Sequence, residues 1–194
     1  MTSILDAVRQ QLGPDAIQQM SGALGADPAA TSGAVSLALP AILAGLSHNA
    51  SQPQGAVALD TALDAHDGSI LGNLGGILGG GGGIGGAILG HIFGNRRGTV
   101  EQKVGHGSGL NAAQVAQLMA MLAPIVMGVL GRMKQSKQLD ANQLPDVLQH
   151  SREQGEKEIP GLGGLLDANN DGHVADDVLR MGTSALGGMF GKKG

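Results

Sequence analysis

The chain contains no cysteine, no tryptophan and no tyrosine among its 194 residues, and only two phenylalanines, Phe93 and Phe190. The absence of cysteine excludes disulfide bonds, thiol catalysis and cysteine-based zinc sites. Aromatic side chains usually supply much of the buried area of a core. Because apolar residues still make up 42% of the chain, we expect a core of aliphatic, methionine and alanine side chains in closely packed helices.

Positive charge is also scarce, since the net charge is −4 and adjacent basic residues occur only as Arg96-Arg97 and Lys192-Lys193. Nucleic-acid-binding surfaces are basic, and single-strand binding adds stacking aromatics. We therefore predict no nucleic-acid partner and interpret both pairs as solvated charges. The first residues, MTSILDAVRQQLG, also lack the basic and apolar regions of a secretory signal. We expect a cytoplasmic protein, with export by another route left open.

Catalytic motifs are equally hard to find. The six histidines are scattered and show no His-Glu-x-x-His spacing, and there is no Gly-x-Ser-x-Gly sequence. The glycine strings are not followed by the Lys-Ser/Thr of a phosphate-binding loop. We predict a protein that is not an enzyme, although carboxylates or histidines assembled only by the fold would escape a search by spacing.

Helix signals dominate the remaining sequence, so the predicted fold class is all-α. Ser3 precedes apolar residues at helical spacing, and Gly13 ends that segment. Pro14 and Gly25 bound a second helix, and Asp27-Pro28 begin a third with a long apolar stripe. Residues 55–65 are expected to form a further short helix.

A shift of 84 residues brings several features of the sequence into coincidence. We interpret residues 14–66 and 98–150 as two degenerate copies of a helical unit that pack as a pseudo-symmetric bundle. Identity between them is low, so chance coincidence is the alternative. The coinciding pairs are Asp27 and Asn111, Pro40 and Pro124, Leu46 and Leu130, and His66 and His150. Both prolines should kink or break a helix, and we interpret them as packing features rather than hinges.

Residues 70–90, ILGNLGGILGGGGGIGGAILG, carry no charge and are about half glycine. Three interpretations remain open for this segment. It is a flexible loop, a pair of short helices packed closely through glycine faces, or a membrane-contacting hairpin. Its apolar side chains argue against a solvated linker, and its glycine run argues against one continuous helix.

These features divide the chain into four parts. We expect a first helical unit over residues 1–66, a glycine-rich connecting hairpin over 67–97 and a second helical unit over 98–150. Residues 151–194 would supply a linker, a metal-binding loop and a closing helix.

The metal-binding loop is predicted from LLDANNDGHVADDVL, residues 165–179, where oxygen ligands are concentrated. Counting from Asp167, the chain has oxygen-bearing side chains at positions 1, 3 and 5 and a glycine at position 6, as in a calcium-binding EF-hand loop. Position 12 is Val178 instead of the usual glutamate. The predicted ligands are Asp167, Asn169, Asp171, the backbone carbonyl of His173, Asp176 and Asp177.

Calcium is the predicted cofactor because it accepts six to eight oxygen ligands in flexible geometry, whereas magnesium demands a tighter octahedron. The alternative is a capped Asn-Asp-Gly turn without metal. Against it, four aspartates packed together without a cation would repel one another.

The sequence also resembles a known family. The segments that carry the resemblance are ILDAVRQQLG, the central glycine-rich segment, LNAAQVAQLMAMLAPIVMGVLG and LDANNDGHVADDVLRMG. They are similar to the bacterial YidB-like proteins, grouped as domain of unknown function 937. The resemblance extends over nearly the whole chain. It implies an all-helical fold and a recurrent acidic loop, and it implies no activity and no catalytic residue. Asn169 stands where many relatives carry aspartate.

Three functions follow from these observations. The first is a calcium-binding helical module that self-associates as a homo-oligomer or scaffolds a protein partner. The second is a protein that contacts a membrane through residues 70–90. The third is a hydrolase whose acid or histidine site is assembled by the fold.

Calcium binding is testable by calorimetry on the wild type and on an Asp167→Ala/Asp171→Ala variant. We expect heat on titration of the wild type and its loss in the variant, because two charged ligands are removed. Sedimentation with and without calcium then reports any change in mass. No heat at about millimolar calcium, the weak end of such loops, would make residues 165–179 a capped turn.

Overall fold

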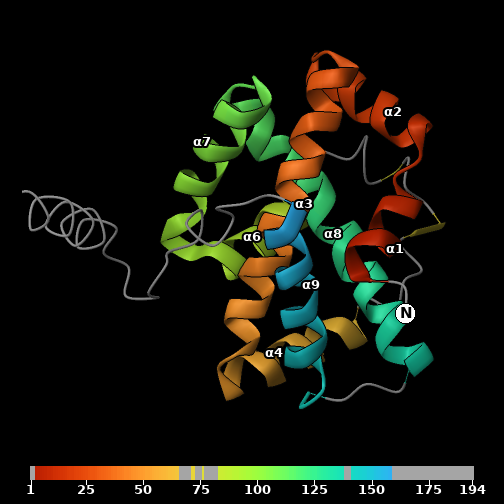
Figure 1. The fold of residues 1–194 in the computed structure, drawn as a ribbon, viewed down its shortest axis with the longest axis vertical. Coiled ribbons are helices and arrows are strands. Elements are labelled where there is room, and N and C mark those ends of the chain that lie inside the picture. The colour runs from red at the N-terminus through yellow and green to blue at the C-terminus, as the bar shows by residue number, and fades with distance from the viewer. Residues whose placement is uncertain (1–2, 66–70, 73–75, 77–82, 138–140, 159–194) are drawn as a thin grey trace, which may run out of the picture.

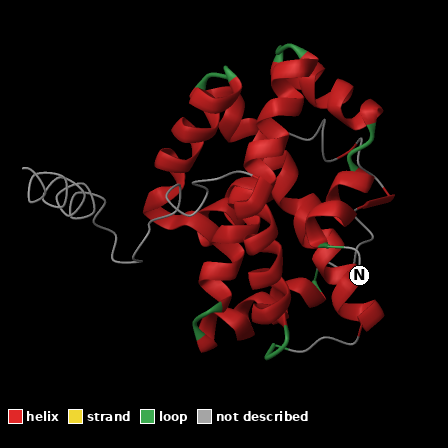
Figure 2. Cartoon of the chain, in the orientation of Figure 1, coloured by secondary structure: helices red, strands yellow, loops and turns green. Residues whose placement is uncertain are grey.

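The computed structural model describes residues 3–65, 71–72, 76, 83–137 and 141–158, and these form helices without any strand (Figures 1 and 2). The all-α prediction is therefore confirmed for this part of the chain. The helices are α1 (Ile4–Gln11), α2 (Pro14–Leu24), α3 (Pro28–Ala50), α4 (Pro53–Asp64), α6 (Gly83–Phe93), the short 3-10 helix η2 (Gly94–Arg96), α7 (Arg97–Ser108), α8 (Ala112–Lys137) and α9 (Leu144–Glu158).

The first three helices begin at the residues that the sequence indicates, and α2 also ends at the predicted glycine. The Ser3 hydroxyl accepts a hydrogen bond from the Asp6 N–H at 3.0 Å and so caps α1. Gly25 ends α2 in the left-handed region at φ 58°, where a residue without Cβ meets no steric penalty. The Asp27 carboxylate then accepts from the N–H groups of Ala29 and Ala30 and caps α3.

The same sequence of signals recurs before α8. Gly109 ends α7 with φ 79°. The Asn111 Oδ1 atom accepts from the Gln114 N–H at 2.9 Å, and Gln114 Oε1 accepts from the Asn111 N–H at 3.1 Å. This reciprocal arrangement is a capping box, which satisfies two backbone donors at once.

The long helices α3 and α8 form the centre of the molecule. Helix α3 contacts α2, α4, α6, α7, α8 and α9, and α8 contacts α1, α2, α4, α6 and α7. Figure 1 shows α9 in front of α3, α4 at one end of the body, and α2 and α7 at the other. From Ala38 to Ser47 and from Leu118 to Gly131 every residue is buried. The core is thus aliphatic, as expected, and Phe93 is the one phenylalanine it includes among the described residues.

Pro40 and Pro124 lie inside helices α3 and α8, and neither proline interrupts its helix. Because proline has no N–H, Pro124 leaves the Ala120 carbonyl without its usual partner one turn earlier. Helix α6 crosses α8 at this carbonyl. A Cβ atom on Gly85 would overlap the backbone of Ala120, so only glycine permits this approach.

Part of the glycine-rich segment is therefore packed helix. Residues 83–90 belong to α6, where Leu89 is fully buried and Ile88 packs against the core. Leu71, which precedes α6, is also buried. Residues 66–70, 73–75 and 77–82 lie outside the described residues, as do the final 36 residues, 159–194.

We predict that Gly85→Ala destabilises the protein by about 1–3 kcal/mol, because the new methyl group forces α6 away from α8. Urea denaturation measures this change. Gly90→Ala is the matched control in the same helix, since a Cβ there meets nothing within 4 Å. It should stabilise by up to about 1 kcal/mol through helix propensity. Equal stabilities of the two variants would contradict the close approach.

Candidate functional site

A cleft of about 540 Å³ lies between α4 and α6, over the end of α3 and the middle of α8. Its volume falls in the range of natural binding pockets, about 300–1,000 Å³. Its floor is apolar and buried, and consists of Leu46, Leu59, Ile92 and Met127. Ala58, Ala62 and Ile88 line its walls.

The sequence places α4 at the cleft through a short turn. Helix α3 ends at Ala50, and Pro53 is already the first residue of α4. Gly55 allows the first turn of α4 to approach the Asn49 carbonyl, because a Cβ at position 55 would overlap it. Helix α4 therefore folds back at the end of α3 and forms one wall of the cleft.

The rim of the cleft is polar and consists of amide and imidazole side chains, namely His48, Asn49, Gln52, Gln54 and His91. The Asn49 Nδ2 atom donates hydrogen bonds to the carbonyls of His91 and Ile92, at 2.9 and 3.1 Å. These carbonyls end α6 and have no partner within their own helix. Asn49 thus fixes the end of α6 against the end of α3.

No aspartate, glutamate, lysine or arginine occurs among the described residues that line the cleft. Its apolar wall also continues beyond the cavity. Ile84 precedes Ile88 by four residues, so both side chains lie on one face of α6. Ile84 is 67% exposed, which is unusual for a large aliphatic side chain and extends the apolar surface by one helical turn.

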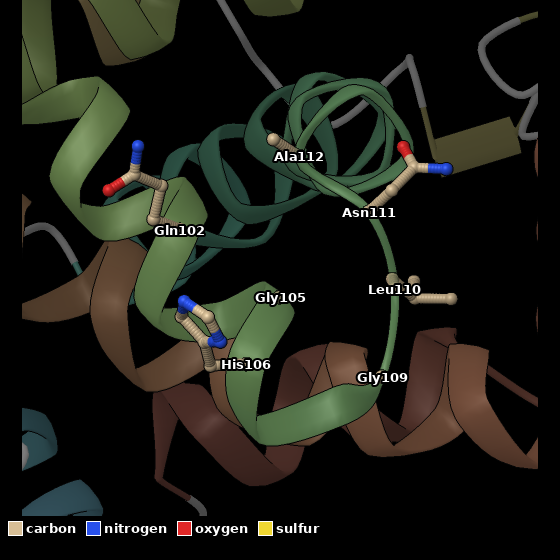
Figure 3. Close-up of a pocket in the computed structure, with 7 residues that line it drawn as sticks. All are labelled: Gln102, Gly105, His106, Gly109, Leu110, Asn111 and Ala112. Atoms are coloured by element: carbon tan, nitrogen blue, oxygen red, sulfur yellow. The ribbon is translucent and has the colours of Figure 1, made fainter.

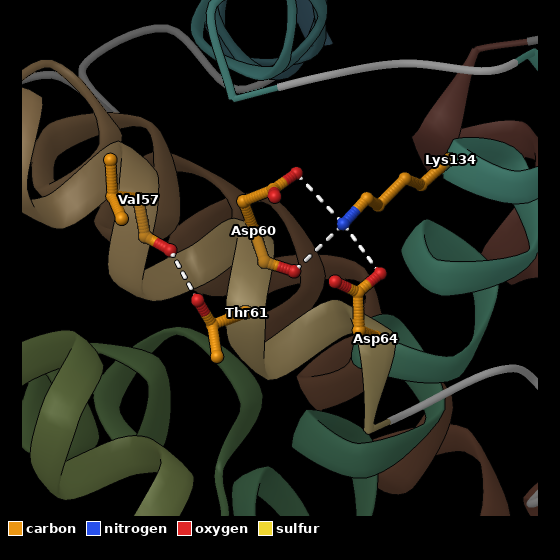
Figure 4. Close-up of polar contacts among 5 residues, drawn as sticks. All are labelled: Val57, Asp60, Thr61, Asp64 and Lys134. Carbon is orange, nitrogen blue, oxygen red and sulfur yellow. Dashed lines mark hydrogen bonds and ion pairs between the residues drawn. The ribbon is translucent and has the colours of Figure 1, made fainter.

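The opposite face of α4 is held by an ion network (Figure 4). The Lys134 Nζ atom of α8 donates to the Asp60 carbonyl at 2.9 Å and to Asp64 Oδ1 at 2.6 Å, and it lies 2.8 Å from Asp60 Oδ1. The Lys134 side chain is only 12% exposed. The network ties α4 to α8 and so fixes the position of the cleft wall.

Two opposing effects act on the pKa of Lys134. Partial burial of the ammonium group would by itself lower this pKa. The hydrogen bonds and negative charges of Asp60 and Asp64 outweigh it and raise the pKa above the ordinary value of 10.5. The charged form is therefore favoured in the folded protein.

A second, smaller cavity of about 380 Å³ lies at the turn between α7 and α8. Figure 3 shows Gln102 and His106 projecting from α7, with Gly105 on the same helix and Gly109 at its end. Asn111, at the same cavity, uses its side chain to cap α8. This cavity therefore carries fewer polar groups that could contact a ligand than the cleft does.

The predicted calcium ligands, Asp167 to Asp177, lie outside the described residues. Within the described residues, no group of three or more histidine and acidic side chains converges on a possible metal position. The cleft was not predicted. Its walls come from segments about 40 and 80 residues apart, and no local motif marks such a combination.

Among the described helices, two are long and apolar enough to cross a membrane, Pro28–Ala50 and Ala112–Ser136. Most of the apolar stretch of each helix is buried inside the protein, 67% in the first helix and 78% in the second. The core helices of a bundle meet the same criterion of length and composition.

Comparison with known proteins identifies a family but no function. The profile of a family described as bacterial proteins of unknown function (DUF937) matches residues 6–133. The chain belongs to this family. No curated protein and no solved structure matches the chain. The matched residues contain every residue that lines the cleft and do not include the acidic segment 165–179.

We predict that Lys134→Met lowers the free energy of unfolding by about 1–2 kcal/mol at neutral pH, because Asp60 and Asp64 lose their shared cation. Lys157→Met, at an exposed position in α9, serves as the control and should change stability by less than about 0.5 kcal/mol. Urea denaturation gives both values.

The pH dependence follows from the raised pKa. A lysine whose pKa is raised by folding stabilises the folded protein at every pH below its unfolded-state pKa. This stabilisation is lost as the pH rises through the folded-state pKa. The difference in the free energy of unfolding between the wild type and Lys134→Met should stay constant from about pH 6 to 9 and shrink above about pH 10.5. A difference that shrinks already near neutral pH would contradict the assignment to Lys134.

Proposed function

We propose that this member of a family of unknown function is a non-enzymatic helical interaction module that self-assembles through the cleft between α4 and α6. The observation that carries the proposal is the chemistry of that cleft. Its floor is apolar, its described lining residues include no Lys, Arg, Asp or Glu, and exposed Ile84 extends it along α6. The occupant is an apolar helical segment from a second copy of the chain.

Physical considerations favour a helix over a small polar ligand. Apolar grooves accept amphipathic helices through side chains at positions i, i+3, i+4 and i+7. The face of α6 formed by Ile84, Ile88 and Ile92 runs for two turns, which matches the length of such a contact. Exposed apolar patches on soluble proteins mark interaction surfaces. A charged ligand would find no opposite charge among the described lining residues.

We also propose that the helical body consists of two copies of one three-helix unit, residues 4–46 and 88–130. Along α2 and α7, and along α3 and α8, most residues 84 apart share their burial. Examples of buried pairs are Ala16 and Val100, Met20 and Val104, Ala34 and Leu118, and Leu46 and Leu130. The left-handed glycines Gly25 and Gly109 and the caps Asp27 and Asn111 keep the same spacing.

These boundaries differ from the ranges 14–66 and 98–150 that the sequence alone indicates. The unit includes α1 and α6, since Leu5 and Leu89 are both buried and lie 84 residues apart. It excludes α4 and α9, because α4 begins at Pro53 and α9 begins at Leu144, 91 residues later.

The two halves differ at one place that matters for function. Helix α1 packs on α8 and on α9. Its counterpart α6 packs on α3, α7 and α8, and α4 packs on α3, α8 and α9. Helices α1 and α9 contact each other directly, whereas the cleft opens between α4 and α6. Residues of α3, α6 and α8 line this cleft, so it lies at the junction of the two halves.

Calcium is part of the proposal as a control of assembly. The predicted loop, residues 167–177, immediately precedes the apolar residues Val178 and Leu179. Binding of a cation to such a loop would fix the start of the segment that follows. The calorimetric titration described above tests this element separately.

We predict that the wild type shows a mass that increases with concentration in sedimentation equilibrium. Ala58→Glu/Ile84→Glu should remain monomeric, because two charges would be desolvated on association. Both positions are exposed, so the variant should fold. Ala23→Glu adds a charge at an exposed position of α2, at the other end of the molecule, and should associate like the wild type.

Two results would overturn the proposed function. One is a wild type that stays monomeric at all concentrations, with and without calcium. The other is equal association of the wild type and Ala58→Glu/Ile84→Glu.

A further inference from the structure

We propose that the occupant of the cleft is the C-terminal segment of the chain itself, residues 178–190, VLRMGTSALGGMF. This inference rests on the proposed function, because it names the segment that the cleft between α4 and α6 binds. It assigns a binding partner to a part of the chain that lies outside the described helices.

The apolar pattern of this segment matches the requirement of the cleft. Val178, Met181, Ala185 and Met189 recur at intervals of three and four residues. Leu179, Leu186 and Phe190 follow these positions by one residue, at intervals of seven and four. Such spacing places apolar side chains on one face of a helix. An apolar helical face fills a groove through anchors at this spacing.

The charge of the segment also agrees with the cleft. Arg180 is its one charged residue. The described residues that line the cleft include no charged aspartate, glutamate, lysine or arginine. A segment of this composition buries no unpaired charge on docking, provided that Arg180 faces the amide and imidazole rim. By contrast, the acidic residues 167–177 would carry several charges into an apolar site.

No other stretch after α9 offers the same surface. Residues 159–166, IPGLGGLL, contain a proline at the second position and three glycines in eight residues. Residues 178–190 are longer and lack proline. The small residues Gly182, Gly187 and Gly188 would permit a close approach to α6, which itself contacts α8 closely through Gly85.

The length of the chain permits this contact. Helix α9 ends at Glu158, and Val178 follows 20 residues later. Twenty residues span at most about 65–70 Å when fully extended. A body of this size has a radius of gyration of about 15 Å. The segment of one copy can therefore extend beyond its own body and reach the cleft of a second copy.

The absence of cysteine from the natural chain makes a direct test possible. We would introduce Ala58→Cys in the wall of the cleft together with Leu186→Cys in the segment, and follow disulfide formation in the full-length protein. The matched control pairs Leu186→Cys with Ala23→Cys, an exposed alanine of α2. A third variant adds Met189→Asp/Phe190→Asp to the Ala58→Cys/Leu186→Cys pair.

We expect the Ala58→Cys/Leu186→Cys pair to form its disulfide at least about tenfold faster than the control, because docking raises the effective concentration. The added aspartates should reduce the rate to the control level. We expect a dimeric product, because the occupant comes from a second copy. A product that is only monomeric would overturn the inference.

Equal rates for the cleft pair and the control pair would overturn the inference. So would a fast rate that survives the two aspartates, because it would reflect the tether and not an apolar contact. The sedimentation experiment on Ala58→Glu/Ile84→Glu is independent of the segment. If sedimentation shows assembly through the cleft but the two disulfide rates are equal, the proposed function is supported. Only the assignment of residues 178–190 as the occupant is then rejected.

Discussion

The structure depends on the close approach of helices in a core that has almost no aromatic side chains. Aliphatic and alanine residues fill space only when helix axes come near one another, and glycine makes the nearest approaches possible. Gly85 packs against the backbone of Ala120, at the carbonyl that Pro124 leaves without a helical partner. Gly45 similarly receives Ile92 and Phe93 of α6, where a Cβ would lie 2.5 and 2.8 Å from their side-chain atoms. Helix α6 thus approaches α8 through its own Gly85, and it approaches α3 at Gly45.

Sequence patterns predicted the features that depend on neighbouring residues. The cap at Ser3, the proline that begins α2 and the stop at Gly25 are local signals, because the side chain or the φ angle acts within one helical turn. The all-α class followed from the same signals. The prolines at 40 and 124 were ambiguous, since a sequence cannot tell whether tertiary packing holds a helix together across the missing hydrogen bond.

The cleft could not be predicted because its parts come from distant segments. Asn49 holds the carbonyls of His91 and Ile92, which lie 42 and 43 positions away, and Lys134 binds Asp60 and Asp64, 74 and 70 positions away. Only the fold brings such residues together. The acidic residues 167–177 present the opposite case, because their spacing is local and their predicted calcium chemistry rests on sequence alone.

In the proposed scheme, two similar helical units form the body, and the apolar cleft between α4 and α6 is the assembly site. Amide hydrogen exchange at low and high protein concentration tests the central claim most directly, because it locates the binding surface without any substitution. The account predicts that protection increases with concentration in α4 and α6, around Ala58 and Ile84, while α2 is unchanged. Protection that increases elsewhere and leaves α4 and α6 unchanged would contradict the assignment of the cleft as the assembly site.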